Sequence, residues 1–396
     1  MDLEKIRSDF PALKEGIIYF DNTSATLTPQ VVIDAICDAY RSPGNARSGH
    51  GFSVEIMFKV KKAREDVRDL INADSIHEII FTKNATEAIN LVAHTMDFDS
   101  GDIVITTDKE HNSNMIPWQM LKKNGVEHRV CRSIDGHVFD LEGFSEMMSN
   151  RVKLVSMAYT SIVDGFNIPA KEVIEIAHDH GAYVMLDGVL TVPYQEVNVQ
   201  KLDVDFLAFS GHNMCGPAGV GVLYGKESLL KALPPFLTGG GTAVETTYER
   251  STFHLPPGKF EAGANNYPGI IGLGEAVNYL TDIGLKNIEE YTSDLTRYIC
   301  QKLQALDILT VKCAAGGGAC GRMCSFNFEG FNPHDLAIHL EEEANILIRS
   351  GIMCAHSWYK ARVSSGVASV SFYVYNTKSE IDKLAETLQA LKEELE

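Results

Sequence analysis

Long apolar runs are missing from this chain of 396 residues. No segment approaches the roughly 20 consecutive apolar residues that a membrane-spanning helix needs. The first ten residues, MDLEKIRSDF, also lack the apolar core of a secretory signal peptide. We therefore expect no membrane partner and no secretion, and the cytoplasm is the default location.

Basic residues are in short supply. The chain has 35 Lys and Arg against 53 Asp and Glu, which gives a formal net charge of −18. Proteins that bind nucleic acid carry a basic surface, so this balance predicts no nucleic-acid partner. The negative charge is compatible with docking to a basic protein partner, but solubility alone explains it better.

Disulfide bonds are a further feature that we do not expect, although the chain has 8 cysteines. Without a secretory leader, thiols in a reducing compartment explain these residues better than a disulfide framework does. A hydrophobic content of 45% and a charged content of 22% are ordinary for a soluble globular protein. A chain of this length can bury a large core, and it suggests about two to three domains.

Short apolar segments alternate with amphipathic helical patterns through the first two-thirds of the chain. Several segments are apolar at consecutive positions, as expected for strands that are covered on both faces of a parallel sheet. The predicted strands are 79–82, 103–107, 154–158, 183–187, 206–210 and 219–224. Helical patterns lie between them, for example at 85–95 and 170–179. This alternation predicts right-handed crossovers and an α/β fold.

A second region follows, with a different order of elements. We predict helices at 269–281, 287–306, 333–343 and 378–395 and strands at 325–328 and 370–374. This order predicts a small α+β C-terminal domain, with the N-terminal segment folding back near it. The predicted domains are a large α/β domain of residues 15–270, and a small α+β domain formed by residues 1–14 and 271–396.

The loop of residues 210–217 has the sequence SGHNMCGP. It resembles the cofactor-anchoring loop of the pyridoxal-phosphate (PLP) enzymes of the class V aminotransferase family. In that family the residue after Ser-Gly-His is a lysine, which holds the cofactor as a Schiff base, exchanges it for the substrate's amine and moves protons. This chain has Asn213 at that position, and an amide does none of these things. The resemblance therefore implies a cofactor-binding scaffold without its covalent anchor.

Further motifs extend the resemblance over essentially the whole chain, to the SUF-type cysteine desulfurases within class V. They are YFDN at 19–22, FTKNATE at 81–87, EHNSNMIPW at 110–118, DG at 187–188, FEAG at 260–263 and RSGIMCA at 349–355. Their order and spacing imply the PLP-dependent transferase fold type I, with a mostly parallel sheet in the large domain and a small α+β C-terminal domain. The same resemblance implies a homodimer, in which residues 261–266 reach the neighbouring subunit. It also implies a role in sulfur metabolism, with a sulfur-acceptor or iron–sulfur assembly protein as a partner.

The resemblance assigns the cofactor's ring and phosphate to particular residues. Asp187 would pair with the pyridinium nitrogen, and the end of a strand is where open α/β sheets bind ligands. His111 would stack on the ring. Ala85 and Thr86 begin a predicted helix, whose free N–H groups and dipole favour a phosphate.

Two residues of the anchoring loop complete this set. Ser210 and His212 match the family's further phosphate contacts. With Asn213 in the anchor position, a protein that uses PLP, or its amine form, would hold the cofactor non-covalently. His212 or His111 would then take over proton transfer.

The departures from the family pattern all remove a contact. Leu190 stands where a glutamine would hydrogen-bond the cofactor's phenolic oxygen, and Ile162 stands where an asparagine would support the same region. Ala264 replaces a threonine that would reach the phosphate across the dimer interface. Ser369 replaces an arginine that would clamp the substrate carboxylate bidentately. Together with Asn213, these losses imply a natural lineage that stopped using the ordinary reaction.

Cys354 lies on the loop that carries the sulfur-accepting nucleophile in the family, where a thiolate takes up the substrate's sulfur as a persulfide. A mobile, polar setting would keep such a thiol reactive. The two residues before it, Ile352 and Met353, are apolar where the family has histidines. That difference weakens the case for a sulfur-accepting thiol without removing it, and a cysteine that is merely packed stays open as the alternative.

The other cysteines suggest a metal site. Cys313, Cys320 and Cys324 are close in sequence, but their spacing matches no standard zinc or ferredoxin pattern. If Cys320 or Cys324 folds toward the pocket, it could join Cys354 and Cys215 as a soft ligand for iron, zinc or an iron–sulfur cluster. The alternative is that these cysteines fill core space as small hydrophobes.

Three functions remain open at this point. The first is a cysteine desulfurase-like protein that has lost ordinary PLP-dependent desulfuration and handles sulfur, or binds a metal or cluster, through Cys354 and its neighbours. The second is a desulfurase or lyase-type enzyme that holds PLP or its amine form without a lysine. The third is an inactive structural or regulatory dimer partner. Whether PLP binds at all decides among them.

Overall fold

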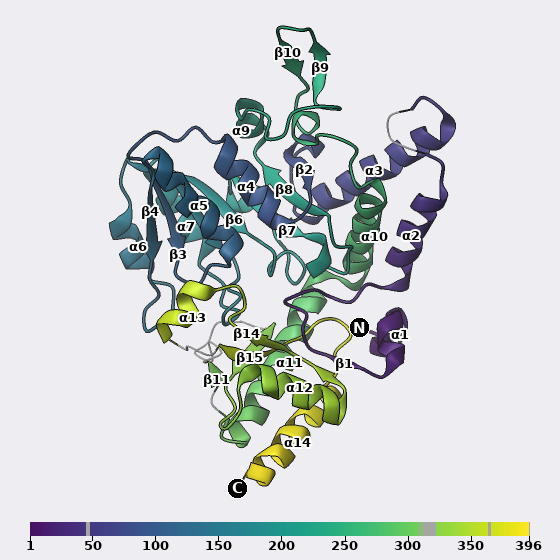
Figure 1. Cartoon of the computed structure of the whole chain (residues 1–396), viewed down its shortest axis with the longest axis vertical. Coiled ribbons are helices and arrows are strands. Elements are labelled where there is room, and N and C mark those ends of the chain that lie inside the picture. Colours follow the sequence, from purple (N-terminus) through teal and green to yellow (C-terminus); the bar gives the residue numbers. More distant parts are fainter. Residues whose placement is uncertain (45–47, 309, 312–321, 363–365, 396) are drawn as a thin grey trace.

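The computed structural model describes the chain except for residues 45–47, 309, 312–321, 363–365 and 396. Its largest feature is a seven-stranded sheet with the strand order β2-β8-β7-β6-β5-β3-β4, in the upper half of Figure 1. Only β8 runs antiparallel to its neighbours, and the other pairs are parallel. The strands are β2 (Ile79–Thr82), β3 (Ile103–Thr107), β4 (Glu127–Cys131), β5 (Val152–Ala158), β6 (Tyr183–Asp187), β7 (Phe206–Ser210) and β8 (Gly221–Gly225).

Both faces of this sheet are buried because its strands are apolar at consecutive positions. On β2, for example, Ile79 and Phe81 join one hydrophobic cluster while Ile80, between them, joins another. The first cluster includes residues of α3 (Gly51–Leu70), α7 (Ala170–Asp179) and α10 (Tyr267–Ile283), and the second includes residues of α4 (Ala85–Thr95) and α5 (Ile116–Met120). The result is a sheet sandwiched between two layers of helices.

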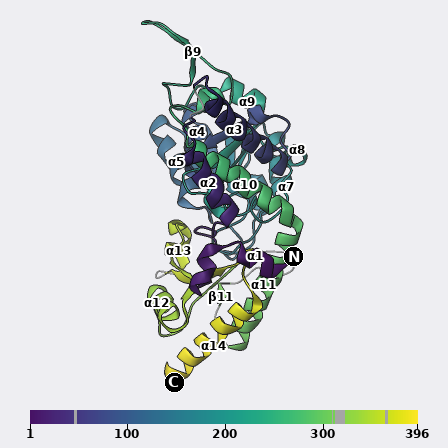
Figure 2. The ribbon, with the colours of Figure 1, turned by 90° about the vertical axis from the view of Figure 1, so that its right-hand side faces the viewer.

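A second, smaller sheet lies in the lower half of Figure 1. Its strand order is β11-β12-β15-β14, and all its pairs are antiparallel. The helices α11, α12 and α14 pack with it around a separate hydrophobic cluster. Figure 2 shows these helices from the side. These elements are β11 (Thr310–Val311), β12 (Met323–Phe326), β14 (Arg349–Gly351), β15 (Val367–Ser371), α11 (Leu285–Ala305), α12 (Pro333–Ala344) and α14 (Lys378–Leu395).

The remaining elements connect or flank the two sheets. Strands β9 and β10 form a hairpin that projects from the body in both views. The connecting and flanking helices and strands are α1 (Leu3–Ser8), α2 (Gln30–Arg41), α6 (Leu141–Met147), α8 (Val199–Leu202), α9 (Glu227–Ala232), α13 (His356–Arg362), β1 (Ile18–Tyr19), β9 (Ala243–Thr246), β10 (Ser251–Phe253) and β13 (Ile346–Leu347). Within the described ranges, no helix combines the length and the apolar character that a membrane span requires.

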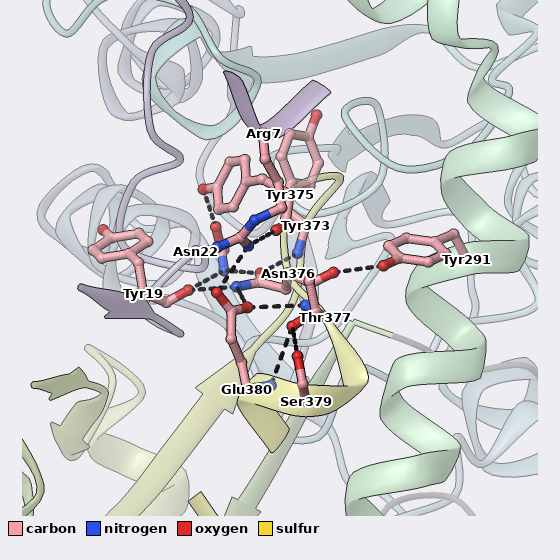
Figure 3. A network of polar contacts seen from close by, with 10 residues as sticks. All are labelled: Arg7, Tyr19, Asn22, Tyr291, Tyr373, Tyr375, Asn376, Thr377, Ser379 and Glu380. Carbon is pink, nitrogen blue, oxygen red and sulfur yellow. Dashed lines mark hydrogen bonds and ion pairs between the residues drawn. The ribbon is translucent and has the colours of Figure 1, made fainter. Parts of the chain in front are cut away.

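A polar network ties the N-terminal segment to the end of the chain (Figure 3). The guanidinium of Arg7 forms an ion pair with Glu380 at 2.8 Å. The side-chain amide of Asn22 donates to the Ser371 carbonyl oxygen at 2.5 Å and to the Asn376 side-chain oxygen at 3.1 Å. The N-terminal segment therefore lies against β15 of the small sheet, and β1 pairs with β13 in a separate two-stranded sheet.

The division into residues 15–270 and residues 1–14 with 271–396 stays a prediction. We propose that the boundary falls at α10, which contains residue 270 and packs against α2 and α3 beside the large sheet. The helix that follows, α11, packs against α14 and β12 of the small sheet.

Candidate active site

A cavity of about 320 Å³ opens at the carboxyl ends of the parallel strands. Ala158, Asp187 and Ser210 are the last residues of β5, β6 and β7, and all three line it. This is the edge at which open α/β sheets bind ligands. The seven residues that the sequence predicts as cofactor-binding all line this cavity, namely Ala85, Thr86, His111, Asp187, Ser210, His212 and Asn213.

One wall of the cavity is the N-terminus of α4. The Ala85 N–H donates to the Ser210 hydroxyl at 2.9 Å, and the Thr86 hydroxyl lies 2.7 Å from that of Ser113. Strand β8 passes close behind, because Gly221 has no side chain: a Cβ there would lie 2.5 Å from the Cα of Asn84. The helix N-terminus and the hydroxyls of Thr86, Ser113 and Ser210 together make a cradle that favours a phosphate or another anion.

Asp187 supplies a negative charge to the same cavity. Its side chain is buried and accepts a hydrogen bond from the Val189 N–H at 3.0 Å. Burial raises its pKa from 3.8 to about 6. No lysine, arginine or histidine in the described part of the chain forms an ion pair with it. A buried carboxylate of this kind is suited to a ligand that brings its own N–H cation, such as a protonated pyridine ring.

His111 is held as a neutral ring. Its Nδ1 accepts a hydrogen bond from the Ser113 N–H at 3.1 Å, so the proton of the neutral imidazole belongs on Nε2. Burial, together with the nearby charges of Arg349 and His356, lowers its pKa to about 4. A neutral ring can stack on an aromatic ligand without the cost of burying a charge.

Asn213 is fixed beside the cavity. Its amide nitrogen donates to the Thr23 carbonyl oxygen at 3.1 Å, and its buried side-chain oxygen has no hydrogen-bond partner among the described residues. Thr23 is itself held by Ser371, whose hydroxyl accepts from the Thr23 N–H at 3.0 Å. The neighbouring His212 also lines the cavity, and burial lowers its pKa. None of the described residues that line the cavity is a lysine.

Four of the apolar departures from the family pattern form one surface. Ile162, Leu190 and Met353 are buried in a single hydrophobic cluster, and Ile352 packs against it. Ile162 and Leu190 also line the cavity. The replacements at these positions therefore make one continuous apolar wall, which joins the cavity to the loop that carries Cys354.

Cys354 lies near the cavity but is not part of its lining. Its carbonyl oxygen accepts a hydrogen bond from the Asn112 N–H at 2.8 Å, which docks its loop on the turn after His111. Met353 and Cys354 both have left-handed backbone conformations, with φ of 47° and 54°. Such conformations are strained for residues other than glycine, and they persist where the surroundings enforce them. The half-buried thiol thus sits on a closely held turn.

The predicted metal site is not formed by the described cysteines. Cys215 is fully buried in the core of the large sheet, and burial raises the pKa of its thiol strongly. Cys324 lies in the separate core of the small sheet, 3.8 Å from the sulfur of Cys300. Cys320 lies outside the described residues, as does Cys313. Within the part of the chain that is described, no group of three or more His, Cys, Asp or Glu is arranged to hold a metal ion.

The other two departures lie away from the cavity. Ser369 is buried in β15, where its hydroxyl lies 3.1 Å from that of Ser325. Ala264 lines a second cavity of about 380 Å³ next to Leu237 and Phe260. Sequence reasoning did not assign a role to Arg349, which lines the main cavity. Its place in the RSGIMCA motif was the available signal.

This arrangement places a helix N-terminus that favours an anion and a buried carboxylate in one crevice of an α/β sheet. A family model described as Aminotransferase class-V matches residues 18–384, and the chain belongs to that family. Its fold is the PLP-dependent transferase fold type I. The prediction of the fold class is therefore confirmed.

Within that family the chain is a homologue of cysteine desulfurases. It is 38% identical to a protein of Synechocystis sp. named "Probable cysteine desulfurase", over 97% of this chain and 94% of that protein. It is 35% identical to a cysteine desulfurase of Haloferax volcanii, over 99% of this chain and 97% of the relative. The apo structure of a cysteine desulfurase from Thermococcus onnurineus superimposes with a TM-score of 0.94 at 35% identity, covering 99% of this chain and 98% of that one.

Proposed function

We propose that this protein is a cysteine desulfurase homologue that binds PLP or pyridoxamine phosphate non-covalently and does not carry out lysine-dependent desulfuration. One observation carries the proposal: an anion cradle and the unpaired carboxylate of Asp187 line a cavity that also contains Asn213. A protein that had abandoned the cofactor entirely would gain nothing from a buried carboxylate with a raised pKa. The residues present therefore fit the cofactor, with an amide where a covalent anchor would stand.

The roles of the individual residues follow from their chemistry. When bound, the cofactor supplies a ring that withdraws electrons from an attached amino acid. Ala85, Thr86 and Ser210 would hold its phosphate at the N-terminus of α4. Asp187 would hold a proton on the ring nitrogen, and neutral His111 would stack on the ring.

The apolar wall has its own consequence for this chemistry. Ile162 and Leu190 offer no hydrogen bond to a polar substituent of the ring, and they exclude water from that side of the cavity. Proton movements in the cavity would then depend on His212 and His111, which line it. Cys354 stays a proposed sulfur acceptor, since the turn that carries it docks next to His111.

Titration of the pure protein with pyridoxamine phosphate tests this proposal. We expect saturable binding with one site per chain by calorimetry, and a PLP complex from which dialysis removes the cofactor completely. Borohydride treatment of the PLP complex should attach no cofactor to residue 213. Absence of binding of both cofactor forms would contradict the proposal and would favour a structural or regulatory role.

We also expect a homodimer. Three aromatic side chains on neighbouring helices are unusually exposed, namely Tyr40 of α2 at 73%, and Phe52 and Phe58 of α3 at 55% and 66%. These helices pack together with α10 through Ala39 and Ile56, so their outer faces are adjacent. Exposed apolar surface of this extent is typical of an association site.

Sedimentation velocity at micromolar concentration should show twice the chain mass of 43.6 kDa. The Phe58→Asp variant should shift the distribution toward the monomer, because it places a charge on the apolar face. A native monomer at this concentration would rule out the dimer.

A further inference from the structure

Arg349 contributes a cation to the lining of the cavity. It is the first residue of β14, its side chain is half-buried, and it lines the same cavity as Asp187 and the start of α4. Its guanidinium forms no hydrogen bond or ion pair with any described residue. The five N–H donors of a guanidinium are rarely left unused in a pocket unless a ligand or water satisfies them.

The surroundings of Arg349 leave its charge available. Burial raises the pKa of Asp21, and the nearby charge of Arg349 opposes that rise, but the Asp21 carboxylate accepts its hydrogen bond from the Ser24 hydroxyl at 2.6 Å. His111, on the other side, is neutral. The positive charge of Arg349 is thus not cancelled by a contact ion pair.

Arg349 lies directly opposite Ser369 in the small sheet. The two are direct partners in the antiparallel pair β14–β15. Side chains at paired positions lie on the same face of a sheet, with their Cβ atoms about 5 Å apart. Ser369 is too short to reach a ligand, is 1% exposed, and is engaged with Ser325. Arg349 therefore places a positive charge on β14, next to the position on β15 where Ser369 stands instead of the family's arginine.

The cavity thus combines two anion-binding features from different parts of the fold. The N-terminus of α4, beside the large sheet, suits a phosphate. The guanidinium of Arg349, from the small sheet, matches the two oxygens of a carboxylate in a bidentate pair. A ligand that satisfies both has a phosphate at one end and a carboxylate at the other.

We infer that Arg349 recognises the carboxylate of an amino acid joined to the cofactor, in place of an arginine at position 369. This inference rests on the proposed function, and it gives the site a substrate class: compounds with a free α-carboxylate. Arg349 acts here as a specificity-determining residue. Its replacement removes discrimination between a carboxylate and an uncharged group at that end of the ligand.

Two stable conjugates test this role. N-(5′-phosphopyridoxyl)-L-alanine carries the phosphate, the ring and a carboxylate, and its alaninamide counterpart differs only in having a neutral amide. The native protein should bind the first more tightly than the second by about 10- to 100-fold, the range expected for a charge-assisted pair. In the Arg349→Gln variant the ratio of the two dissociation constants should fall to about one.

The Arg349→Lys variant should keep part of the preference, because it retains the charge but not the bidentate geometry. The Ser369→Ala variant is the matched control on the neighbouring strand and should preserve the full ratio. If both conjugates bind the native protein and Arg349→Gln leaves their ratio unchanged, the role of Arg349 is refuted while cofactor binding stands. If neither conjugate nor pyridoxamine phosphate binds, the proposed function and this inference both fail.

Discussion

The pure protein, incubated with L-cysteine and PLP, should release no alanine or sulfide above the background of free PLP. Asn213 supplies no amine to take up the cofactor or to move protons within the cavity. Loss of a positioned general base alone costs roughly 10²- to 10⁴-fold in rate. Alanine quantified by mass spectrometry, together with a sulfide assay, measures both products. Turnover at a rate well above free PLP, with the native sequence, would show that the cavity performs desulfuration without a lysine.

The Asn213→Lys variant separates the anchor from the rest of the site. It should bind PLP covalently, giving a yellow protein in which borohydride fixes the cofactor to residue 213. Desulfuration should nevertheless stay low, because Leu190 and Ile162 leave the ring's polar substituent without a hydrogen bond. The Asn213→Leu variant, similar in size but without an amine, serves as the control and should gain no covalent cofactor.

The second large effect is expected at Asp187, where stability and binding should change in opposite directions. Burial raises the pKa of this carboxyl from 3.8 to about 6, so the folded protein holds the proton more tightly than the unfolded chain does. The resulting cost to stability is absent below about pH 4, grows as the pH rises, and is complete above about pH 6. At about 1.4 kcal/mol per pKa unit, it amounts to about 3 kcal/mol at neutral pH.

The Asp187→Asn variant without cofactor should therefore resist denaturant better than the native protein at pH 7, by up to about 3 kcal/mol. The difference should shrink as the pH falls toward 4. The same variant should bind pyridoxamine phosphate about 10- to 100-fold more weakly, because the charged partner of the ring nitrogen is gone. A variant that is no more stable and binds equally well would show that Asp187 is only a strand-end residue.

Much of the large sheet could be predicted because its strands are apolar at consecutive positions. The helices Ala85–Thr95 and Ala170–Asp179 and the strands Ile79–Thr82 and Ile103–Thr107 form at the predicted positions. Strand Glu127–Cys131 was missed: it lies at the edge of the sheet and is mostly only half-buried, so it carries no continuous apolar run. The antiparallel direction of β8 was likewise not encoded in any local pattern.

Part of the candidate site could also be predicted, because its motifs follow the predicted strands. Motifs at the ends of consecutive strands must converge, which is why Asp187 and Ser210 meet at the cavity. The pairing of Arg349 with Ser369 could not be predicted, because cross-strand register depends on residues far apart in the sequence. Cys215 was misplaced because its backbone turns at φ 63°, and its side chain enters the core.

Because of the hydrogen bonds around Asn22, one wall of the cavity forms later than the large sheet does. The wall at Thr23, which anchors Asn213, is held by Ser371, and the segment before it is tied to Asn376 and Glu380. During synthesis the large sheet is complete once residue 225 has left the ribosome. The cavity nevertheless gains this wall only when residues 371–380 have emerged as well, and domains fold as units in that order. A nascent chain would therefore present a formed sheet with an open crevice, and would become competent to capture its ligand only after Ser371 is available to hold Thr23.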